Sequence, residues 1–151
     1  MKTTAPNGRF AQVPGEAIGD RLAVGQTLAR YAAALDQGVP SALEGVLTED
    51  ATWTFTVDGV AGPGPFAGRA AILAFVQGAA AQAGRQRHHL TNVFFGDPDE
   101  GAMEVRAYLM LTSSAGGSPR LAATGSYTFT LRRVRNEWRV AKLVLDMETA
   151  G

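Results

Sequence analysis

The sequence predicts an α+β fold in which a long, curved antiparallel sheet is wrapped around three helices. Helical patterns lie in the first 83 residues, patterns typical of long strands fill the rest, and no strand-helix-strand alternation is present. The chain has 151 residues, no cysteine, 46% hydrophobic residues and 14 side chains of each charge, which suits one globular domain. We expect this domain to span residues 16–148, after a flexible arm over residues 1–15 where proline and glycine recur.

Three segments carry helical periodicity. The first, residues 16–37, ends before Gly38, and its apolar face comprises Val24, Leu28, Tyr31 and Leu35. A short second helix is expected over residues 40–47, because Pro40 suits a first helical turn. The third is expected over residues 69–83, with the apolar stripe Ile72, Phe75, Val76 and Ala79.

The strands are predicted from alternation and from the turn residues that separate them. They are expected at residues 51–57, 87–96, 102–114, 121–135 and 137–147. Alternation places Arg106 and Tyr108 on the outer face of their strand, where they look like surface or interface residues.

Composition excludes several classes of function. Charges of both signs are scattered, so neither the basic surface of a nucleic-acid binder nor a polybasic membrane patch is expected. No apolar run reaches the roughly 18 residues of a membrane helix, and no signal peptide is recognisable, which favours the cytoplasm. We find no dinucleotide fingerprint, P-loop or metal motif, so we expect no cofactor and no metal. The partner is expected to be a small molecule or a protein.

The histidines, His88 and His89, are adjacent on a predicted strand. Adjacent strand residues point to opposite faces, so one imidazole should face the interior, where it could transfer a proton. The alternatives are a core histidine satisfied by a backbone carbonyl, or two histidines at a frayed start of the strand. Asp36 lies in the last turn of the first helix, where its charge opposes the helix dipole. It is either a surface residue of the following turn or the partner of His88.

Other polar and aromatic side chains could line a cavity. The rings of Tyr31, Trp53 and Tyr127 are expected mainly to line the cavity, and their polar groups to contact a ligand only in second place. Asn92 shares a face with His88 by alternation, which makes it a pocket donor or a sheet-edge residue.

Several loose motifs follow one another from about residue 20 to 147. They are Tyr31-(x4)-Asp36-x-Gly38, Leu47-Thr48-Glu49-Asp50-Ala51-Thr52-Trp53, Phe66-x-Gly68-Arg69-x-x-Ile72, Arg87-His88-His89-Leu90-Thr91-Asn92-Val93, Gly125-x-Tyr127 and Trp138-Arg139-Val140. In this order they resemble the SnoaL-like branch of the nuclear-transport-factor-2-like superfamily. The resemblance implies a cone-shaped α+β barrel, in which three helices and a curved antiparallel sheet enclose one deep, mostly apolar cavity.

The branch includes scytalone dehydratase, hexachlorocyclohexane dehydrochlorinase, bile-acid dehydratase, polyketide cyclases and non-catalytic β subunits of ring-hydroxylating dioxygenases. By resemblance, Asp36 and His88 hold the positions of a catalytic Asp-His pair. Trp53 and Tyr127 match aromatic cavity positions, and Tyr31 matches a tyrosine of the bile-acid enzyme. At Leu143, a further cavity position, the dehydrochlorinase carries a cationic side chain for the halide, so dehalogenation is not implied.

We therefore expect a cofactor-independent lyase, isomerase or cyclase that acts on a small apolar metabolite. This metabolite would resemble a polyketide, a steroid or an aromatic compound. His88 would remove a proton, Asp36 would hold its tautomer, and Tyr31 or Tyr127 would polarise the substrate oxygen. The alternative is a non-catalytic ligand-binding module or a dioxygenase β-subunit-like protein. A homodimer or homotrimer is expected, as is usual in the superfamily.

Overall fold

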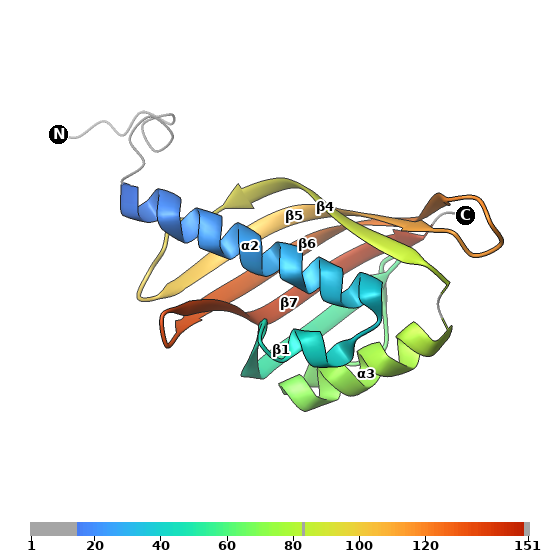
Figure 1. Ribbon diagram of the computed structural model, residues 1–151, viewed down its shortest axis with the longest axis horizontal. Coiled ribbons are helices and arrows are strands. Elements are labelled where there is room, and N and C mark those ends of the chain that lie inside the picture. The colour runs from blue at the N-terminus through green and yellow to red at the C-terminus, as the bar shows by residue number, and fades with distance from the viewer. Residues whose placement is uncertain (1–14, 83, 150–151) are drawn as a thin grey trace.

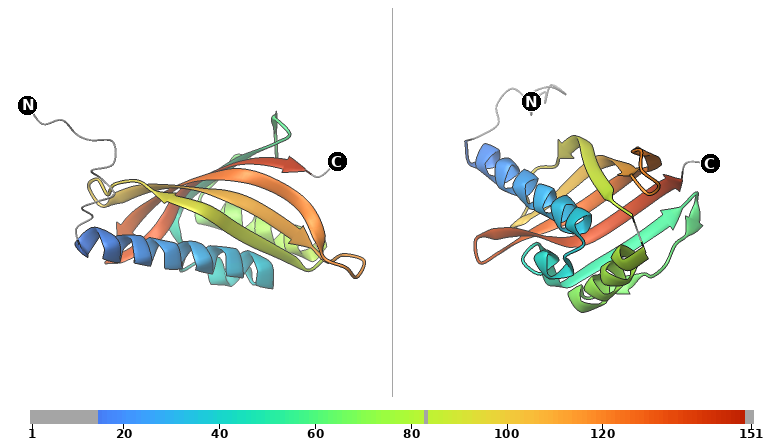
Figure 2. Two further views of the ribbon diagram at one scale, coloured as in Figure 1. Left: turned by 90° about the horizontal axis from the view of Figure 1, so that it is seen from above. Right: turned by 45° about the vertical axis from the view of Figure 1, so that its right-hand side comes forward.

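The computed structural model describes residues 15–82 and 84–149, in which two helices lie against the concave face of a curved sheet (Figures 1 and 2). Helix α2 (Gly15–Gln37) crosses the sheet diagonally, and α3 (Arg69–Gln82) lies beneath its β1 side. The strands are β1 (Leu47–Val57), β2 (Val60–Ala61), β3 (Phe66–Ala67), β4 (Gln86–Phe95), β5 (Ala102–Ser113), β6 (Arg120–Val134) and β7 (Glu137–Thr149). The predicted α+β, cone-like fold is confirmed.

The sheet has the order β2-β1-β7-β6-β5-β4, with β3 paired to β1, and it does not close into a barrel. Neighbouring strands are antiparallel except β1 and β7, which are parallel. The expectation of a wholly antiparallel sheet is wrong for this pair. No hairpin joins β1 to β7, and the long connection between them permits the parallel arrangement, which a short hairpin would not.

The first and third predicted helices are confirmed, and the second is not a helix of the expected length. Residues 40–47 contain only the single 3-10 turn η1 (Pro40–Leu43), and Leu47 already belongs to β1, opposite Val140 of β7. So short a segment is compatible with both periods, and here pairing with a neighbouring strand outweighs the local helical signal. Ala83, the predicted last residue of the third helix, lies outside the described residues, as does the predicted arm except Gly15.

The core lies between α2, α3 and the concave face of the sheet. Val24, Leu28 and Tyr31 of the predicted apolar face of α2 are at most 3% exposed, and Leu35 packs against them. Gly38 ends α2 with φ +64°, a left-handed conformation that glycine adopts without strain. This ending places Asp36 beside the start of β4.

No helix in the described part of the chain is long and apolar enough to cross a membrane.

Candidate active site

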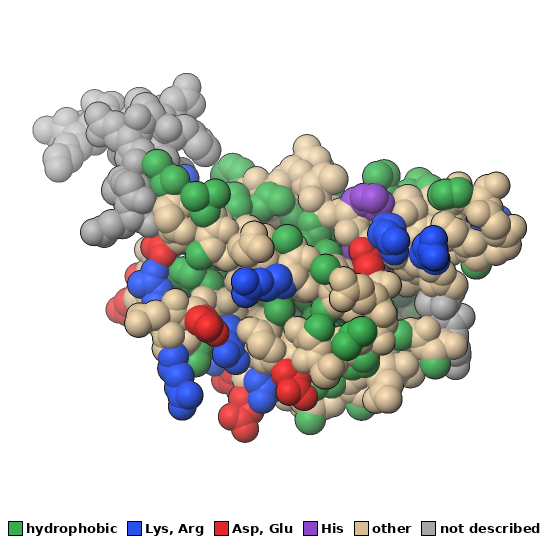
Figure 3. Space-filling view, viewed as in Figure 1, with side chains coloured by type: hydrophobic (Ala, Val, Ile, Leu, Met, Phe, Trp, Pro, Cys, Tyr) green, Lys and Arg blue, Asp and Glu red, His purple; other side chains and the backbone are tan. Residues whose placement is uncertain are grey.

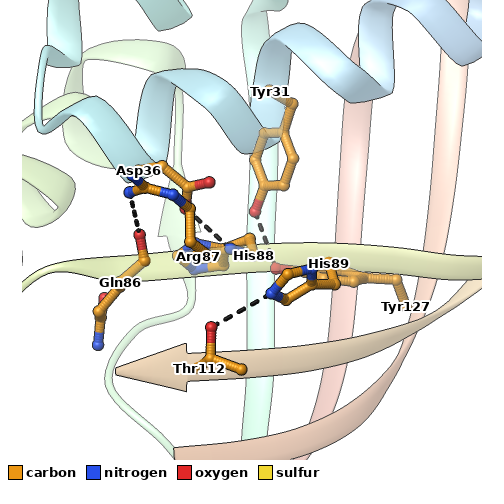
Figure 4. Close-up of polar contacts among 8 residues, drawn as sticks. All are labelled: Tyr31, Asp36, Gln86, Arg87, His88, His89, Thr112 and Tyr127. Atoms are coloured by element: carbon orange, nitrogen blue, oxygen red, sulfur yellow. Dashed lines mark hydrogen bonds and ion pairs between the residues drawn. The ribbon is translucent and has the colours of Figure 1, made fainter. Parts of the chain in front are cut away.

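Asp36 and His88 meet where the last turn of α2 packs against the start of β4 (Figure 4). The Asp36 Oδ1 atom lies 2.7 Å from His88 Nδ1 and accepts a second hydrogen bond, of 2.8 Å, from the His88 backbone N–H. The two side chains are only 15% and 14% exposed, respectively. One carboxylate oxygen therefore holds both the main chain and the ring of His88, which restricts the orientation of the imidazole.

This contact determines which ring nitrogen of His88 carries the proton. An ionised carboxylate only accepts hydrogen bonds, so Nδ1 must donate to Asp36. In the neutral imidazole the proton then lies on Nδ1, and the lone pair lies on Nε2. No described residue forms a hydrogen bond with Nε2. His88 thus has a free basic nitrogen, as a general base requires.

His89 points to the opposite face of β4, as alternation predicts, and is exposed. Its Nε2 atom lies 3.2 Å from the hydroxyl of Thr112 on β5. The inward histidine is therefore His88.

A cavity of about 270 Å³ opens beside His88, between α3 and the sheet. Trp53 and Tyr127 line it, as the sequence predicts. Among the described residues, no Lys, Arg, Asp or Glu is part of its wall. The remaining lining side chains are Leu35, Phe55, Phe75, Val76, Ala79, Ala80, Gln86, Leu109, Leu111, Leu145 and Met147. The cavity is thus apolar and offers a few polar groups, of which His88 is one.

The strand register explains how distant residues share this wall. Phe55 of β1, Leu145 of β7 and Tyr127 of β6 lie side by side in one row across the sheet. Two residues before Tyr127, a Cβ atom at Gly125 would lie 2.7 Å from the carbonyl oxygen of Asp146. Only glycine fits there without a backbone shift, which accounts for the Gly125-x-Tyr127 motif.

Aromatic rings form one end of the cavity. The Trp53 ring lies 5.5 Å from Phe55, and 5.5 Å from Phe75 in an edge-to-face arrangement. The indole Nε1–H is buried and has no hydrogen-bond partner among the described residues. Rings of this kind favour a flat apolar ligand.

A second polar pair lies deeper in the interior, where Tyr31 of α2 meets Tyr127 of β6 with 3.0 Å between the hydroxyl oxygens (Figure 4). Burial raises the pKa of Tyr31 well above its usual value, and the Tyr127 charge and hydrogen bond add to the rise. Burial also raises the pKa of Tyr127, to about 12, although the bond from Tyr31 lowers it. Both phenols therefore stay protonated at neutral pH and act as hydrogen-bonding groups.

Two predicted site residues lie elsewhere. Asn92 has φ +52° in a bulge of β4 between Thr91 and Phe94; it is exposed and does not line the cavity. The bulge interrupts the alternation on which the prediction rested. Leu143 is fully buried opposite Trp53 and Phe129, because the cavity begins farther along β7, at Leu145.

Tyr31 is 1% exposed and is separated from the cavity by Tyr127, so it does not line the wall itself. Sequence reasoning also missed Gln86, a polar lining residue. It lies two residues before His88 on the same face of β4, so alternation could have found it.

A second cavity, of about 390 Å³, lies on the other side of the Asp36–His88 pair, between α2 and β4. Apart from Asp36 and His88, its lining is apolar or glycine, for example Ala29, Leu90 and Phe95. His88 therefore lines both cavities, whereas Asp36 lines only the second. Over residues 15–82 and 84–149, no three His, Asp or Glu side chains gather closely enough to hold a metal ion.

Comparison with known proteins agrees with this architecture. A family model described as the SnoaL-like domain matches residues 16–144. A solved protein from Novosphingobium aromaticivorans, described as a candidate aromatic ring hydroxylase, is 30% identical with a TM-score of 0.73, over 89% of this chain and 91% of its own. No curated protein matches the chain.

Two further structures from the same organism share the fold. One, described as a candidate scytalone dehydratase, is 18% identical with a TM-score of 0.71, and the match covers 89% of each chain. The other is the beta subunit of a candidate aromatic-ring-hydroxylating dioxygenase. It is 13% identical with a TM-score of 0.74, and the match covers 89% of this chain and 93% of its own.

Proposed function

The chain belongs to the SnoaL-like family, and we propose that it is a cofactor-independent lyase, isomerase or cyclase acting on a small, largely apolar metabolite. The observation that carries the proposal is the 2.7 Å contact between Asp36 Oδ1 and His88 Nδ1 at the wall of an apolar cavity. It leaves Nε2 as the basic nitrogen, next to a space where a substrate can bind.

In the proposed reaction, His88 Nε2 removes a proton from a carbon next to a carbonyl group, and the electron pair moves toward the carbonyl oxygen. Asp36 acts as a positioning residue: it holds the tautomer and stabilises the imidazolium that forms. The hydrogen-bonded pair of Tyr31 and Tyr127 supplies the hydroxyl group that stabilises the developing oxyanion. A well-placed general base contributes roughly 10²–10⁴-fold to the rate. The proton then returns to another atom of the substrate or to a leaving hydroxyl.

The size of the cavity bears on the substrate. A benzene molecule occupies an apolar cavity of about 150 Å³. The 270 Å³ beside His88 favours one or two rings, and it is small for four fused rings. Of the three substrate types expected from the resemblance, an aromatic-like or small polyketide-like molecule therefore fits better than a steroid.

The proposal is tested by deuterium exchange. We expect the protein to accelerate deuterium uptake from D₂O at the carbon next to the carbonyl in at least one of α-tetralone, β-tetralone and cyclohexenone, followed by NMR. The His88→Gln and Asp36→Asn variants should lose this acceleration while keeping the native circular dichroism spectrum. Glutamine has no basic ring nitrogen, and a neutral amide at position 36 does not stabilise the imidazolium that forms. If no ketone exchanges faster than in buffer, or if His88→Gln exchanges as fast as the wild type, proton abstraction by His88 is wrong.

The alternative is a non-catalytic ligand-binding module, such as a β-subunit-like protein. The dominance of apolar side chains in the cavity wall favours it, because binding alone needs no base. Saturable binding of a ketone without exchange would support this alternative.

We also propose a homo-oligomer, a dimer or trimer, that uses the outer face of the sheet. Tyr108 is 57% exposed there, and the Arg106 side chain beside it is 71% exposed. On the α2 face of the molecule, by contrast, charged side chains of both signs are intermingled (Figure 3). Light scattering on Tyr108→Glu and wild-type protein tests the proposal, since a charge at the interface should shift the mass toward the monomer.

A further inference from the structure

Tyr31 and Tyr127 form a buried polar pair that is separate from the contact between Asp36 and His88. Tyr31 and Tyr127 are 1% and 2% exposed, and their rings meet edge-to-face at 6.0 Å. Both rings also pack on Phe129, at 5.7 and 4.6 Å, respectively. Packing of both rings on each other and on Phe129 therefore restricts how the two hydroxyl groups can move relative to each other.

The surroundings of the two hydroxyl groups decide which one donates. The pair has two protons and shares one hydrogen bond of 3.0 Å. No other described residue forms a hydrogen bond with the Tyr31 hydroxyl, and Tyr31 does not line the cavity. If Tyr127 donated, the Tyr31 proton would be buried without an acceptor, which is costly. If Tyr31 donates, its proton is bonded to the Tyr127 oxygen, and only the Tyr127 proton has no partner in the pair. Tyr127 lines the cavity, where a ligand can accept that proton.

Burial raises the pKa of both tyrosines, so both hydroxyl groups keep their protons and can donate. A hydroxyl group that accepts a hydrogen bond is also a better donor, because the two bonds polarise each other.

We propose that Tyr127 presents its hydroxyl proton to the carbonyl oxygen of a neutral ligand with one or two rings, and that Tyr31 is a positioning residue that donates to Tyr127. A carboxylate or phosphate ligand is disfavoured, because no Lys or Arg of the described chain lines the cavity to compensate a buried negative charge. The inference rests on the proposed function only in taking this cavity as the substrate site; it does not require His88 to be a base.

The test compares two molecules of nearly the same shape, α-tetralone and tetralin, of which only the first has a carbonyl oxygen. Wild-type protein should bind α-tetralone about tenfold more tightly, the ratio for one neutral hydrogen bond of about 1.4 kcal/mol. The infrared carbonyl band of bound α-tetralone should also move to lower frequency. In Tyr127→Phe the affinity ratio should fall to about 1 and the band shift should disappear.

Tyr31→Phe should lower the affinity ratio by about twofold and reduce the band shift, because Tyr127 loses the bond that polarises it. Tyr108→Phe is the matched control: it removes the hydroxyl of the exposed tyrosine on the outer face and should change neither measurement. His88→Gln should stop proton exchange yet leave the band shift in place, so failure of the proposed function and of this inference are distinguishable.

Three results would overturn the inference. In Tyr127→Phe, the result would be an affinity ratio of α-tetralone to tetralin and a carbonyl band that both equal those of the wild type. In Tyr31→Phe, it would be a carbonyl band identical to that of the wild type. The third result is failure of α-tetralone to bind the wild-type protein.

Discussion

Replacing Asp36 by alanine tests the contact on which the candidate site depends. The substitution removes both hydrogen bonds accepted by Asp36 Oδ1, from His88 Nδ1 at 2.7 Å and from the His88 backbone N–H at 2.8 Å. Hydrogen bonds to a charged group contribute about 1.5–3 kcal/mol each. Because the side chains are 15% and 14% exposed, solvent screens these bonds little.

Two effects oppose the loss. Removing a negative charge from the C-terminal turn of α2 recovers about 0.3–1 kcal/mol, and alanine gains up to about 0.7 kcal/mol in helix propensity. We therefore expect the free energy of unfolding to fall by about 3 kcal/mol in Asp36→Ala. For a domain of this size, the melting temperature should fall by roughly 6–12 °C.

Urea denaturation followed by circular dichroism measures the change. Asp36→Asn keeps a neutral acceptor for the backbone N–H, so it should lose about half as much stability. Gln37→Ala, at the exposed neighbouring position, is the control and should stay within about 0.5 kcal/mol of the wild type. If Asp36→Ala is no less stable than Gln37→Ala, the carboxylate does not hold His88 and the reasoning is refuted.

Three further predictions concern the tyrosine pair and one surface ion pair. Tyr127→Phe should lower the free energy of unfolding by about 1–3 kcal/mol and Tyr31→Phe by about 1 kcal/mol, because only the first leaves a buried donor unpaired; equal losses in urea denaturation would contradict the direction of the bond. Because the pKa of Tyr127 is raised to about 12, its contribution to stability is complete below the ordinary tyrosine value of about 10 and is lost as the pH rises toward 12. Alkaline melting curves should therefore fall more steeply in the wild type than in Tyr127→Phe. Hydrogen bonds from Arg132 and Thr48 lower the pKa of Asp50. The contribution of Asp50 to stability is therefore present above the ordinary aspartate pKa of about 4 and is lost as the pH falls below it. The melting temperatures of wild type and Arg132→Gln should accordingly converge in acid, and a gap that widens there would contradict the assignment.

Local periodicity was enough to identify most elements and to predict that one of the two histidines faces the interior. The apolar face of α2, the strands of the second half and the inward histidine each depend on side-chain spacing within one segment. The charge of Asp36 at an unfavourable helix end was also a local signal. What periodicity could not supply was the partner of each strand.

Pairing between distant segments decided the rest. Because β1 pairs with β7 in parallel, Leu47 lies in a strand and not in the predicted helix. The same pairing places Leu143 in the core rather than at the cavity. The bulge in β4 turned Asn92 outward, since one extra residue reverses a face.

Residue types and their order along the chain therefore determined that this protein has an α+β fold with one inward histidine, and the structure decided that Asp36 contacts it. Only the tertiary structure decided that Tyr31 lies behind Tyr127, and that Tyr127 and His88 share one small cavity. The physical reason is that spacing within a segment sets which face a side chain occupies, whereas the register between segments sets what that face meets.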